Sequence, residues 1–300
     1  MAELVVIAGA TATGKSEIAI EVSKAIGAEI VNADSMQVYQ GMDIGTAKLP
    51  LAERGGVTHH LLDLVKVSTD VTVAWYQEIA RAKVDELLNA GTSVVVVGGT
   101  GFYIKAILDD LNFPETDPQV RAKITDEAER LGSAAMHQRL ATLDPAAALA
   151  IPAENVRRVV RALEVIEITG KPFTANLPRE ASTRYPSAKQ FGLQMDRQTL
   201  DARIDARVEK MWQQGFVDEV EALINQGLLE GKTARAAIGY AQIIAMKHGE
   251  LSEAAAKAET ALATRQYARR QETWFTRDER ITWIAPGDSQ VRLSTILAAL

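Results

Sequence analysis

Short apolar runs alternate with amphipathic stretches along the first hundred residues of the chain. A bounded apolar run of about four to eight residues is typical of a buried β-strand, and apolar residues spaced three and four apart are typical of a helix. We therefore predict strands at residues 4–8, 29–32, 60–65 and 93–97. We also predict crossover helices at residues 17–26 and 74–89. This alternation indicates an open parallel sheet with helices on its faces.

The strand pattern disappears from residue 114 to residue 186, and helical spacing takes its place. Three helices are predicted there, at residues 119–131, 135–143 and 154–169. We interpret this stretch as a helical subdomain inserted into the sheet domain.

The remainder of the chain returns to the mixed pattern. A strand is predicted at residues 190–195, and helices follow at 200–214 and 217–226. Ser252 suits an N-cap, the alanine-rich residues 254–270 continue as a helix, and residues 281–284 form a last strand. We therefore expect an α/β core made of residues 1–113 and 187–300, with the insertion at 114–186.

The composition is that of an ordinary globular protein of 300 residues, with 47% hydrophobic and 24% charged residues. The absence of cysteine excludes a disulfide framework, a thiolate zinc site and a cysteine nucleophile. No apolar run is long enough to span a bilayer, and the N-terminus lacks a secretory signal pattern, so we expect a cytoplasmic protein. The net charge of -6 argues against nonspecific polyanion binding without excluding a local basic surface.

A phosphate-binding pattern follows the first predicted strand and opens the first predicted helix. It consists of Gly9, Ala10, Thr11, Ala12, Thr13, Gly14, Lys15 and Ser16, which satisfy G-x-x-x-x-G-K-[ST]. The glycines let backbone N–H groups converge on phosphate oxygens, Lys15 adds a positive charge, and Ser16 can hold Mg²⁺. We therefore predict a P-loop NTPase-like fold, in which a parallel sheet is flanked by helices.

The loop indicates a bound phosphate but does not identify the reaction. An ATPase or GTPase usually carries a metal-assisting acidic residue at a neighbouring strand tip, whereas the strand at 93–97 continues into Gly98 and Gly99. Asp63 could fill that role. Another acidic residue, Asp34, follows the second predicted strand, and loops at the carboxyl ends of parallel strands share one crevice. We therefore expect Asp34 to face the bound phosphate.

Six tracts of the chain resemble the tRNA dimethylallyltransferase family of the bacterial type, also called tRNA isopentenyltransferase, and they occur in family order. They are the loop at residues 34–48, VVVVGGTGFY at 94–103, NVRRVVRALEV at 155–165, RIDARVEKMWQQGFVDEV at 203–220, AIGYAQ at 237–242 and TRQYARRQETWF at 264–275. The resemblance covers nearly the whole chain and is far more specific than the phosphate loop alone.

This resemblance implies transfer of a dimethylallyl group from dimethylallyl diphosphate to the N6 amine of an adenosine in tRNA, the one just 3′ of the anticodon. The phosphate loop then holds the diphosphate of the donor with Mg²⁺, and no γ-phosphate need be transferred. The partners that the resemblance implies are the donor and the anticodon stem-loop of tRNA. We expect no membrane partner and a monomeric enzyme.

Four residues are expected to carry the chemistry. Asp34 is the candidate general base, by its strand-tip position and by resemblance. Lys15 would stabilise the negative charge that gathers on the departing diphosphate. The resemblance places Thr100 near the reacting amine or the leaving group, and it lets Arg203 reach the diphosphate. As alternatives, Asp34 could cap its turn, Thr100 could cap the next helix, and Arg203 and Arg207 could form surface ion pairs.

A second group of residues is expected to contact tRNA, mainly by resemblance. These residues are Asp34, Ser35, Met36, Gln37, Arg121, Arg157, Arg158 and Arg161. Gln37 could read the edge of a base that has left its stack. Helical spacing puts the arginines of the third inserted helix together, where they can neutralise phosphates. The apolar stripe of that helix consists of Val156, Val159, Val160, Leu163 and Ile166.

The last family tract is basic, with Arg265, Arg269, Arg270 and Arg277 beside Gln266 and Trp274. Such a helix can bind RNA, but we expect the ring of Trp274 to pack into the core. The chain departs from the family at Ala241, where many members carry a basic or polar side chain. An RNA contact there must come from Ile238, Gly239, Tyr240 or the backbone. His59 and His60 are interpreted as structural, with no metal bound.

Three other functions stay open at this stage. A related prenyltransferase could act on free adenine nucleotides, but it should not need a helical insertion with an arginine face. A phosphate-loop kinase would transfer or hydrolyse the γ-phosphate of ATP. A noncatalytic RNA-binding protein would keep its RNA affinity and have no chemistry to lose when Asp34 is replaced.

Overall fold

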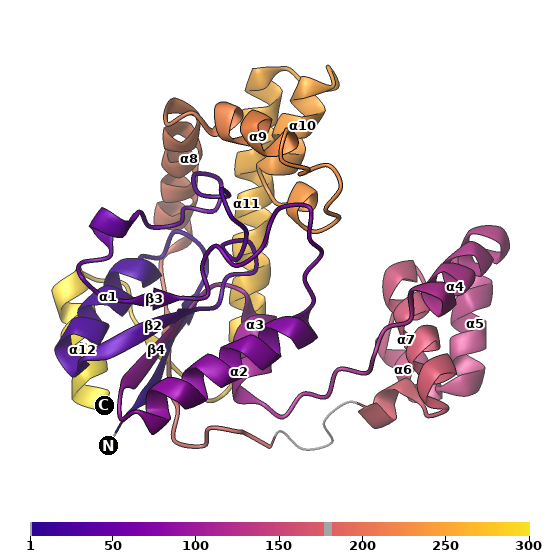
Figure 1. Cartoon of the computed structure of the whole chain (residues 1–300), viewed down its shortest axis with the longest axis horizontal. Coiled ribbons are helices and arrows are strands. Elements are labelled where there is room, and N and C mark those ends of the chain that lie inside the picture. Colours follow the sequence, from indigo (N-terminus) through magenta and orange to yellow (C-terminus); the bar gives the residue numbers. More distant parts are fainter. Residues whose placement is uncertain (1, 177–181) are drawn as a thin grey trace. The chain divides into compact units, whose positions relative to one another are not determined.

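The computed structural model describes residues 2–176 and 182–300. The chain divides into two compact units, one made of Met1–Leu108 with Tyr185–Leu300 and the other of Asp109–Arg184. We call them the sheet unit and the helical unit. The predicted insertion, residues 114–186, falls within the helical unit except at its C-terminal end. Figure 1 follows both units along the sequence.

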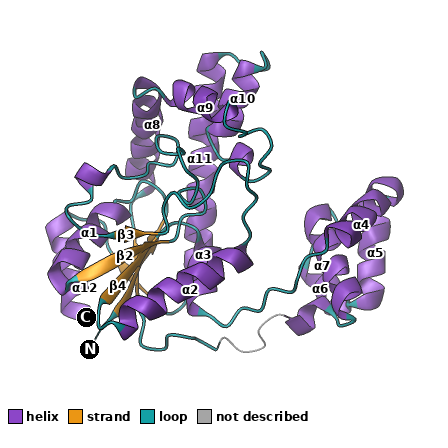
Figure 2. Ribbon diagram, in the orientation of Figure 1, coloured by secondary structure: helices purple, strands orange, loops and turns teal. Residues whose placement is uncertain are grey.

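The sheet unit is built on a parallel sheet with the strand order β3-β2-β4-β1-β5-β6. The strands are β1 (Leu4–Gly9), β2 (Ala28–Asn32), β3 (His59–His60), β4 (Ser93–Val97), β5 (Lys189–Leu193) and β6 (Ile281–Ile284) (Figure 2). Every residue of β1 and β4 is buried, as expected for central strands that are covered on both faces. The predicted parallel α/β fold is therefore observed.

The predicted strand at residues 60–65 is wrong in extent, because β3 ends at His60. Leu61 and Asp63 both adopt positive φ angles, of 64° and 56°, which a β-strand does not allow. The apolar residues after His60 therefore pack as an irregular loop, and Leu61 still reaches the core.

Helices cover both faces of the sheet. They are α1 (Lys15–Ile26), α2 (Val73–Asn89), α3 (Gly101–Leu108), α8 (Arg197–Gln213), α9 (Phe216–Ile224), α10 (Tyr240–Lys247), α11 (Glu253–Phe275) and α12 (Ser289–Ala299). Figure 1 shows α1 and α12 on one side of the sheet, and α2 and α3 on the other. Side chains of each strand alternate between the two cores; Val5 packs with α1 and Val6 with α2. Ser252 caps α11 as predicted, accepting from Ala255 N–H at 3.2 Å.

The helical unit packs four helices around a core of its own. They are α4 (Pro118–Leu131), α5 (Ser133–Leu143), α6 (Pro145–Ala150) and α7 (Val156–Thr169). The predicted stripe of α7 is correct for Val159, Val160 and Leu163, which are buried, but wrong for Val156, which is 36% exposed. Asn155 caps the helix by accepting from Arg158 N–H, so Val156 lies in the first turn, outside the packed stretch.

A buried carboxylate joins two helices of this unit. Glu164 is fully buried, and its Oε2 accepts from Arg121 Nη2 at 2.7 Å and from Arg161 Nη1 at 2.9 Å. Its Oε1 accepts from Asp117 N–H at 3.1 Å, next to the start of α4. The carboxylate thereby ties α7 to α4.

Glu164→Gln is expected to destabilise the helical unit by about 2 kcal/mol, because charge-assisted hydrogen bonds become weaker while both guanidinium groups remain. Urea unfolding combined with hydrogen exchange of the α4 and α7 amides measures the change. Glu129→Gln, at an exposed position of α4, is the matched control and should change stability by less than about 0.5 kcal/mol. Equal stability of the two variants would contradict the role of Glu164.

Candidate active site

The phosphate loop turns sharply between β1 and α1. Gly14 adopts a left-handed conformation with φ of 89° at the N-cap of α1, which favours glycine. Within the loop, Thr13 Oγ1 donates to Ala10 O at 2.8 Å, and Lys15 Nζ donates to the same oxygen at 2.6 Å. These bonds fix a compact loop directly before a helix N-terminus, the geometry that binds anions. We call residues 9–16 the anion loop.

A glutamine of α11 clasps this loop from outside. Gln271 is 5% exposed; its Oε1 accepts from Thr11 N–H at 2.8 Å, and its Nε2 donates to Gly99 O at 2.8 Å. A Cβ at Gly99 would lie 2.2 Å from that nitrogen, so a larger residue there would displace the Gln271 amide. Gln271 therefore joins the anion loop to the turn after β4. Sequence reasoning missed this residue, although it lies inside the last family tract.

Asp34 lies two residues beyond the end of β2 and faces the same cavity. Its Oδ1 accepts from Met36 N–H at 2.8 Å, so the turn-capping interpretation also holds. Burial raises the pKa of the Asp34 carboxyl, while the Met36 N–H and the charge of Lys15 act to lower it. A carboxyl with a raised pKa is a better proton acceptor than an ordinary surface carboxylate when it is ionised.

Lys15 is coupled electrostatically to Asp34. Burial and the neighbouring charge of Arg207 lower the pKa of Lys15 to about 7, and the attraction of Asp34 opposes this shift. Each of the two charges thus opposes the pKa shift that burial causes in the other group, which places them close together in a poorly solvated region.

One cavity of about 740 Å³ joins some of the predicted site residues of the sheet unit. The predicted residues that do not line it are Gly9, Ala10, Thr13, Ser35, Met36, Thr100 and Arg203. Its lining includes Gly14, Lys15, Ser16, Asp34, Gln37 and Arg207. Gln37 Nε2 donates to Thr46 O at 3.0 Å, which holds that side chain along the wall. The cavity therefore brings together an anion site, a carboxyl of raised pKa and an amide side chain, as the sequence predicted for these residues.

Two arginines of α8 reach the anion loop. Arg207 Nη1 donates to Thr11 Oγ1 at 3.1 Å, and Arg203 Nη1 lies 3.5 Å from Ala12 O. Surface ion pairing was the alternative for both, and the structure contradicts it. The acidic residues of α8 have other partners, namely Asp201 with Arg197, Asp205 with Arg265 and Glu209 with Lys257. Arg207 makes the shorter contact, although the resemblance singled out Arg203.

Thr100 belongs to a hydroxyl network that faces Asp34. Its Oγ1 accepts from Ser35 N–H at 3.2 Å and lies 3.4 Å from Ser35 Oγ. Tyr267 of α11 hydrogen-bonds with both Thr100 and Gln271, and burial together with the charge of Asp34 raises the pKa of Tyr267 to about 12. The network orients the Asp34 loop against α11. Tyr267 is a further residue that the sequence did not reveal.

Comparison with known proteins decides the family. The IPP transferase family model matches residues 37–278. The chain is 54% identical over 289 residues to the tRNA dimethylallyltransferase of Thermobifida fusca, covering 95% of this chain and 90% of that protein. It is 50% identical over 300 residues to that of Nocardioides sp., covering 99% and 96%. The chain belongs to the tRNA dimethylallyltransferase family.

Solved structures agree with this assignment. The tRNA isopentenylpyrophosphate transferase of Bacillus halodurans matches with a TM-score of 0.73 and 34% identity, over 100% of this chain and 95% of that one. A eukaryotic dimethylallyltransferase acting on tRNA matches with a TM-score of 0.80 and 25% identity, over 97% and 75%. The P-loop NTPase-like fold is therefore confirmed, and this family member is a transferase of the prenyl-transferring kind.

Asp63, His59 and His60 each have protein partners in this dimethylallyltransferase. The Asp63 carboxylate is held at 2.6 Å by Lys48 Nζ, which also contacts Asp43, so Asp63 serves a buried lysine. His59 bonds to Val57 O, and His60 pairs with Glu29, as the structural interpretation expected. Across residues 2–176 and 182–300, no cluster of three or more histidine, aspartate and glutamate side chains could hold a metal ion.

The prediction that Trp274 packs into the core is wrong, and one of the alternatives for RNA contact at residues 237–242 is removed. Trp274 is 43% exposed, because Gln271 and Phe275 occupy the buried positions of that turn of α11; its ring packs edge-to-face on Phe102. The Tyr240 side chain is fully buried and donates to Glu219 Oε1 at 2.6 Å, so it offers no surface to RNA. Arg265 is engaged by Asp205.

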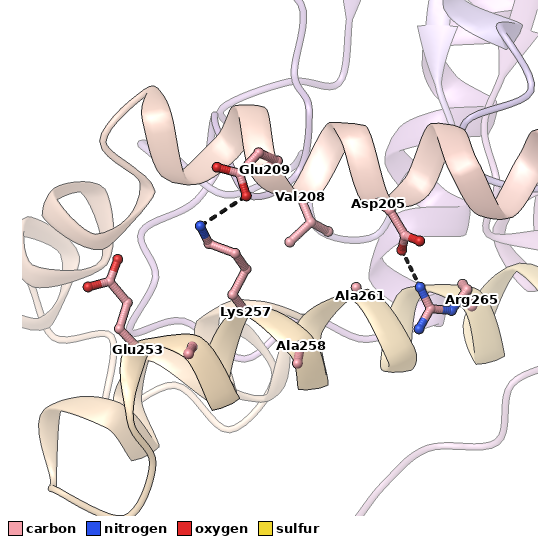
Figure 3. Close-up of a pocket in the computed structure, with 9 residues that line it drawn as sticks. Asp205, Val208, Glu209, Glu253, Lys257, Ala258, Ala261 and Arg265 are labelled. Carbon is pink, nitrogen blue, oxygen red and sulfur yellow. Dashed lines mark hydrogen bonds and ion pairs between the residues drawn. The ribbon is translucent and has the colours of Figure 1, made fainter.

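A second cavity, of about 710 Å³, lies between α8 and α11. Figure 3 shows the ion pairs Glu209–Lys257 and Asp205–Arg265 joining the two helices, with Val208 of α8 facing Ala258 and Ala261 of α11. It shares no lining residue with the larger cavity that holds Asp34 and Lys15. The pairs join the two helices that present Arg207 and Gln271 to the anion loop, so we interpret this region as structural support.

The four arginines of the helical unit that were predicted to contact tRNA fall into two pairs. Arg121 and Arg161 are bound to Glu164, as described above, whereas Arg157 and Arg158 are exposed and have no partner among the residues that the structure describes. Of these four, Arg157 and Arg158 are the two that offer unneutralised charge at the surface. Within the described ranges, no helix is both long enough and apolar enough to cross a membrane.

Proposed function

We propose that this enzyme transfers a dimethylallyl group from dimethylallyl diphosphate to N6 of the adenosine 3′-adjacent to the anticodon in tRNA, with release of diphosphate. The observation that carries the proposal is that Asp34 and the anion loop line one cavity, with the charges of Asp34 and Lys15 acting on each other. The tRNA dimethylallyltransferase relatives support the choice of donor and acceptor.

The reaction forms one bond and breaks one. The N6 lone pair bonds to the allylic carbon while the bond from that carbon to the diphosphate oxygen breaks, and its electron pair leaves with the diphosphate. The N6 amine is a weak nucleophile because its lone pair is delocalised into the ring. Asp34 accepts the proton that N6 gives up, which keeps positive charge from building on the amine.

The anion loop stabilises the leaving group. Negative charge grows on the diphosphate as the carbon–oxygen bond breaks, and fixed donors aimed at that charge lower the barrier. Lys15 and Arg207 supply positive charge, and Gly14 lines the same wall of the cavity. Low solvation of Lys15, evident from its lowered pKa, makes its charge more effective than it would be in water.

A magnesium ion at this site would be bound mainly by the phosphates of the substrate and by few protein ligands. Ser16 opens α1 and lines the cavity, and its hydroxyl would be the protein ligand. Mg²⁺ commonly keeps several waters and binds substrate phosphates with few protein ligands, which matches a site of one hydroxyl beside an anion loop. When bound, it would neutralise diphosphate charge.

The acceptor base must leave its stack to reach the cavity, and the polar lining can then recognise it. Gln37 lines the cavity and is proposed to contact the extruded base, together with Ser35 and Met36 of the same loop. We assign Arg157 and Arg158 to tRNA phosphates, because their charge is exposed and unpaired. We further propose that the enzyme acts in the cytoplasm as a monomer.

The function is tested by incubation with labelled dimethylallyl diphosphate, Mg²⁺ and unmodified tRNA, followed by nucleoside analysis. We expect N6-dimethylallyladenosine at one position of tRNA. Parallel reactions with free AMP, ADP and ATP test the nucleotide prenyltransferase, and release of labelled γ-phosphate tests the kinase. Preferential prenylation of a free nucleotide, or phosphate transfer without prenylation, would overturn the proposal.

The pH dependence of kcat/KM should carry an acid limb that belongs to Asp34. The carboxyl must be ionised to accept a proton, and burial raises its pKa, so activity should fall on acidification earlier than an ordinary carboxylate would cause. Residual activity of Asp34→Asn should lack this limb. Persistence of the same limb in that variant would assign the titration to another group.

Arg157→Gln combined with Arg158→Gln should weaken tRNA binding without changing the KM for the donor. Loss of two phosphate contacts reduces the slope of log Kd against log salt by about 1.4 to 1.8. Binding titrations across salt concentrations measure this slope. The control is Lys24→Gln combined with Lys83→Gln, which removes two positive charges from the sheet unit. Lys24 lies in the last turn of α1. This double variant should leave the slope unchanged. Equal slopes for the two double variants would remove the assignment.

A further inference from the structure

Arg292 of α12 lies against the anion loop with only 5% of its surface exposed. Its Nη1 donates to Thr13 O at 3.1 Å, its Nη2 to Gln194 O at 2.7 Å, and its Nε to Ala285 O at 3.3 Å. Within the described part of the chain, no carboxylate lies within ion-pair distance of this guanidinium. A buried charge held only by carbonyl oxygens costs stability, so packing alone does not account for an arginine here.

The contact with Thr13 fixes the orientation of one peptide in the loop. A trans peptide is planar, so its C=O and N–H groups point in opposite directions. Because the carbonyl of Thr13 points to Arg292, the N–H of Gly14 points away from it. Gly14 lines the cavity that holds Lys15 and Asp34, and its left-handed conformation, with φ of 89°, permits this turn of the chain.

The two C-terminal helices α11 and α12 each hold one backbone group of the anion loop. Gln271 of α11 binds the N–H of Thr11, and Arg292 of α12 binds the carbonyl of Thr13. Arg292 also joins the loop to the ends of β5 and β6 through Gln194 and Ala285. The hydroxyl of Ser289, in the first turn of α12, donates to Glu17 Oε1 at 3.0 Å, which anchors that helix to the start of α1.

We propose that Arg292 is a positioning residue for the diphosphate, which holds the Thr13–Gly14 peptide so that the Gly14 N–H faces the cavity, and which adds a fixed positive charge behind the loop. This inference rests on the proposed function, because it treats the anion at the loop as the donor's diphosphate. It assigns a role in catalysis to a helix that lies beyond the residues 37–278 of the family match.

The test measures the affinity for inorganic pyrophosphate by calorimetry, and the steady-state kinetics with dimethylallyl diphosphate and tRNA. Arg292→Met should weaken pyrophosphate binding and lower kcat/KM for the donor by about tenfold, with the KM for tRNA unchanged. Arg292→Lys keeps the charge but not the fork of donors, and it should recover part of the loss.

Ile296→Ala separates positioning from general support by α12. Ile296 is fully buried on the same helix, so this variant loosens α12 without touching the loop. It should lower Tm at least as much as Arg292→Met and leave pyrophosphate affinity unchanged. Wild-type pyrophosphate affinity in Arg292→Met, or an equal loss in Ile296→Ala, would overturn the inference. If the wild type bound pyrophosphate but prenylated no tRNA, the proposed function would fail while this comparison kept its meaning.

Discussion

Replacing Asp34 by alanine is expected to lower kcat for dimethylallyl transfer by about 10² to 10⁴, the usual contribution of a general base. The carboxyl lines the cavity with Lys15, and burial raises its pKa, whereas the other acidic residues that line the cavity, Glu17, Asp43 and Glu53, are exposed. Single-turnover rates with saturating donor and tRNA measure the effect on chemistry without product release. Asp34 also caps a turn, so alanine could change the rate through the structure of the loop. Asp34→Asn should therefore be measured beside Asp34→Ala, because the asparagine oxygen can still accept from the Met36 N–H.

Asp63→Asn is the matched control for this change. It also removes a carboxylate from the loop region, but Asp63 contacts Lys48, which keeps Asp43 as a second partner. We expect its kcat to stay within about threefold of wild type, in line with a small structural effect. A wild-type rate in Asp34→Asn would remove Asp34 as the base. A loss in Asp63→Asn as large as that in Asp34→Asn would instead revive Asp63 as a metal-assisting acid.

Lys15→Ala is expected to lower kcat/KM for dimethylallyl diphosphate by about 10² to 10³, comparable to removing one preorganised donor to a developing negative charge. Part of the loss should fall on kcat, because charge on the leaving diphosphate is larger in the transition state than in the bound donor. Affinity for tRNA should not change. Initial rates over a matrix of donor and tRNA concentrations, with a separate binding titration of tRNA, resolve these quantities.

Lys15→Arg provides the matched variant, since it keeps a positive charge with a different shape. It should recover part of the donor kcat/KM but not all, because a guanidinium does not fit a position where Lys15 Nζ lies 2.6 Å from Ala10 O. An unchanged kcat/KM in Lys15→Ala would show that the anion loop does not hold the donor. A selective loss of tRNA affinity would show that the anion loop binds the acceptor tRNA and not the donor.

Strong local patterns explain why much of this fold follows from sequence. The strands β4 and β6 have the bounds that were predicted. The valine run of β4 is buried throughout, and β6 is a mainly apolar run with polar residues before it. Short helices were missed for the opposite reason. The eight residues of α3 are mostly apolar and show no polar face, and α12 begins within a polar stretch after Asp288, whose capping of the helix was not recognised.

The candidate site was predictable where its charged and polar residues belong to recognisable sequence patterns. Asp34, Lys15 and Gln37 belong to recognisable tracts, and parallel-sheet topology brings the strand-tip loops together. Gln271 and Arg292 could not be found in this way, because their partners are backbone atoms whose positions no residue pattern reveals. Trp274 was misplaced for a related reason, since a neutral glutamine occupies the buried position of its helical turn.

The proposed transfer requires Asp34 and the donor diphosphate to meet at one adenine amine. The most direct measurement is a structure of this enzyme with an anticodon stem-loop and an unreactive thio-analogue of dimethylallyl diphosphate. We predict the diphosphate on Gly14, Lys15 and Arg207, and the adenine N6 within about 3.2 Å of the Asp34 carboxylate. An adenine seated elsewhere, with Asp34 bonded only to its own turn and a diphosphate far from N6, would contradict the account.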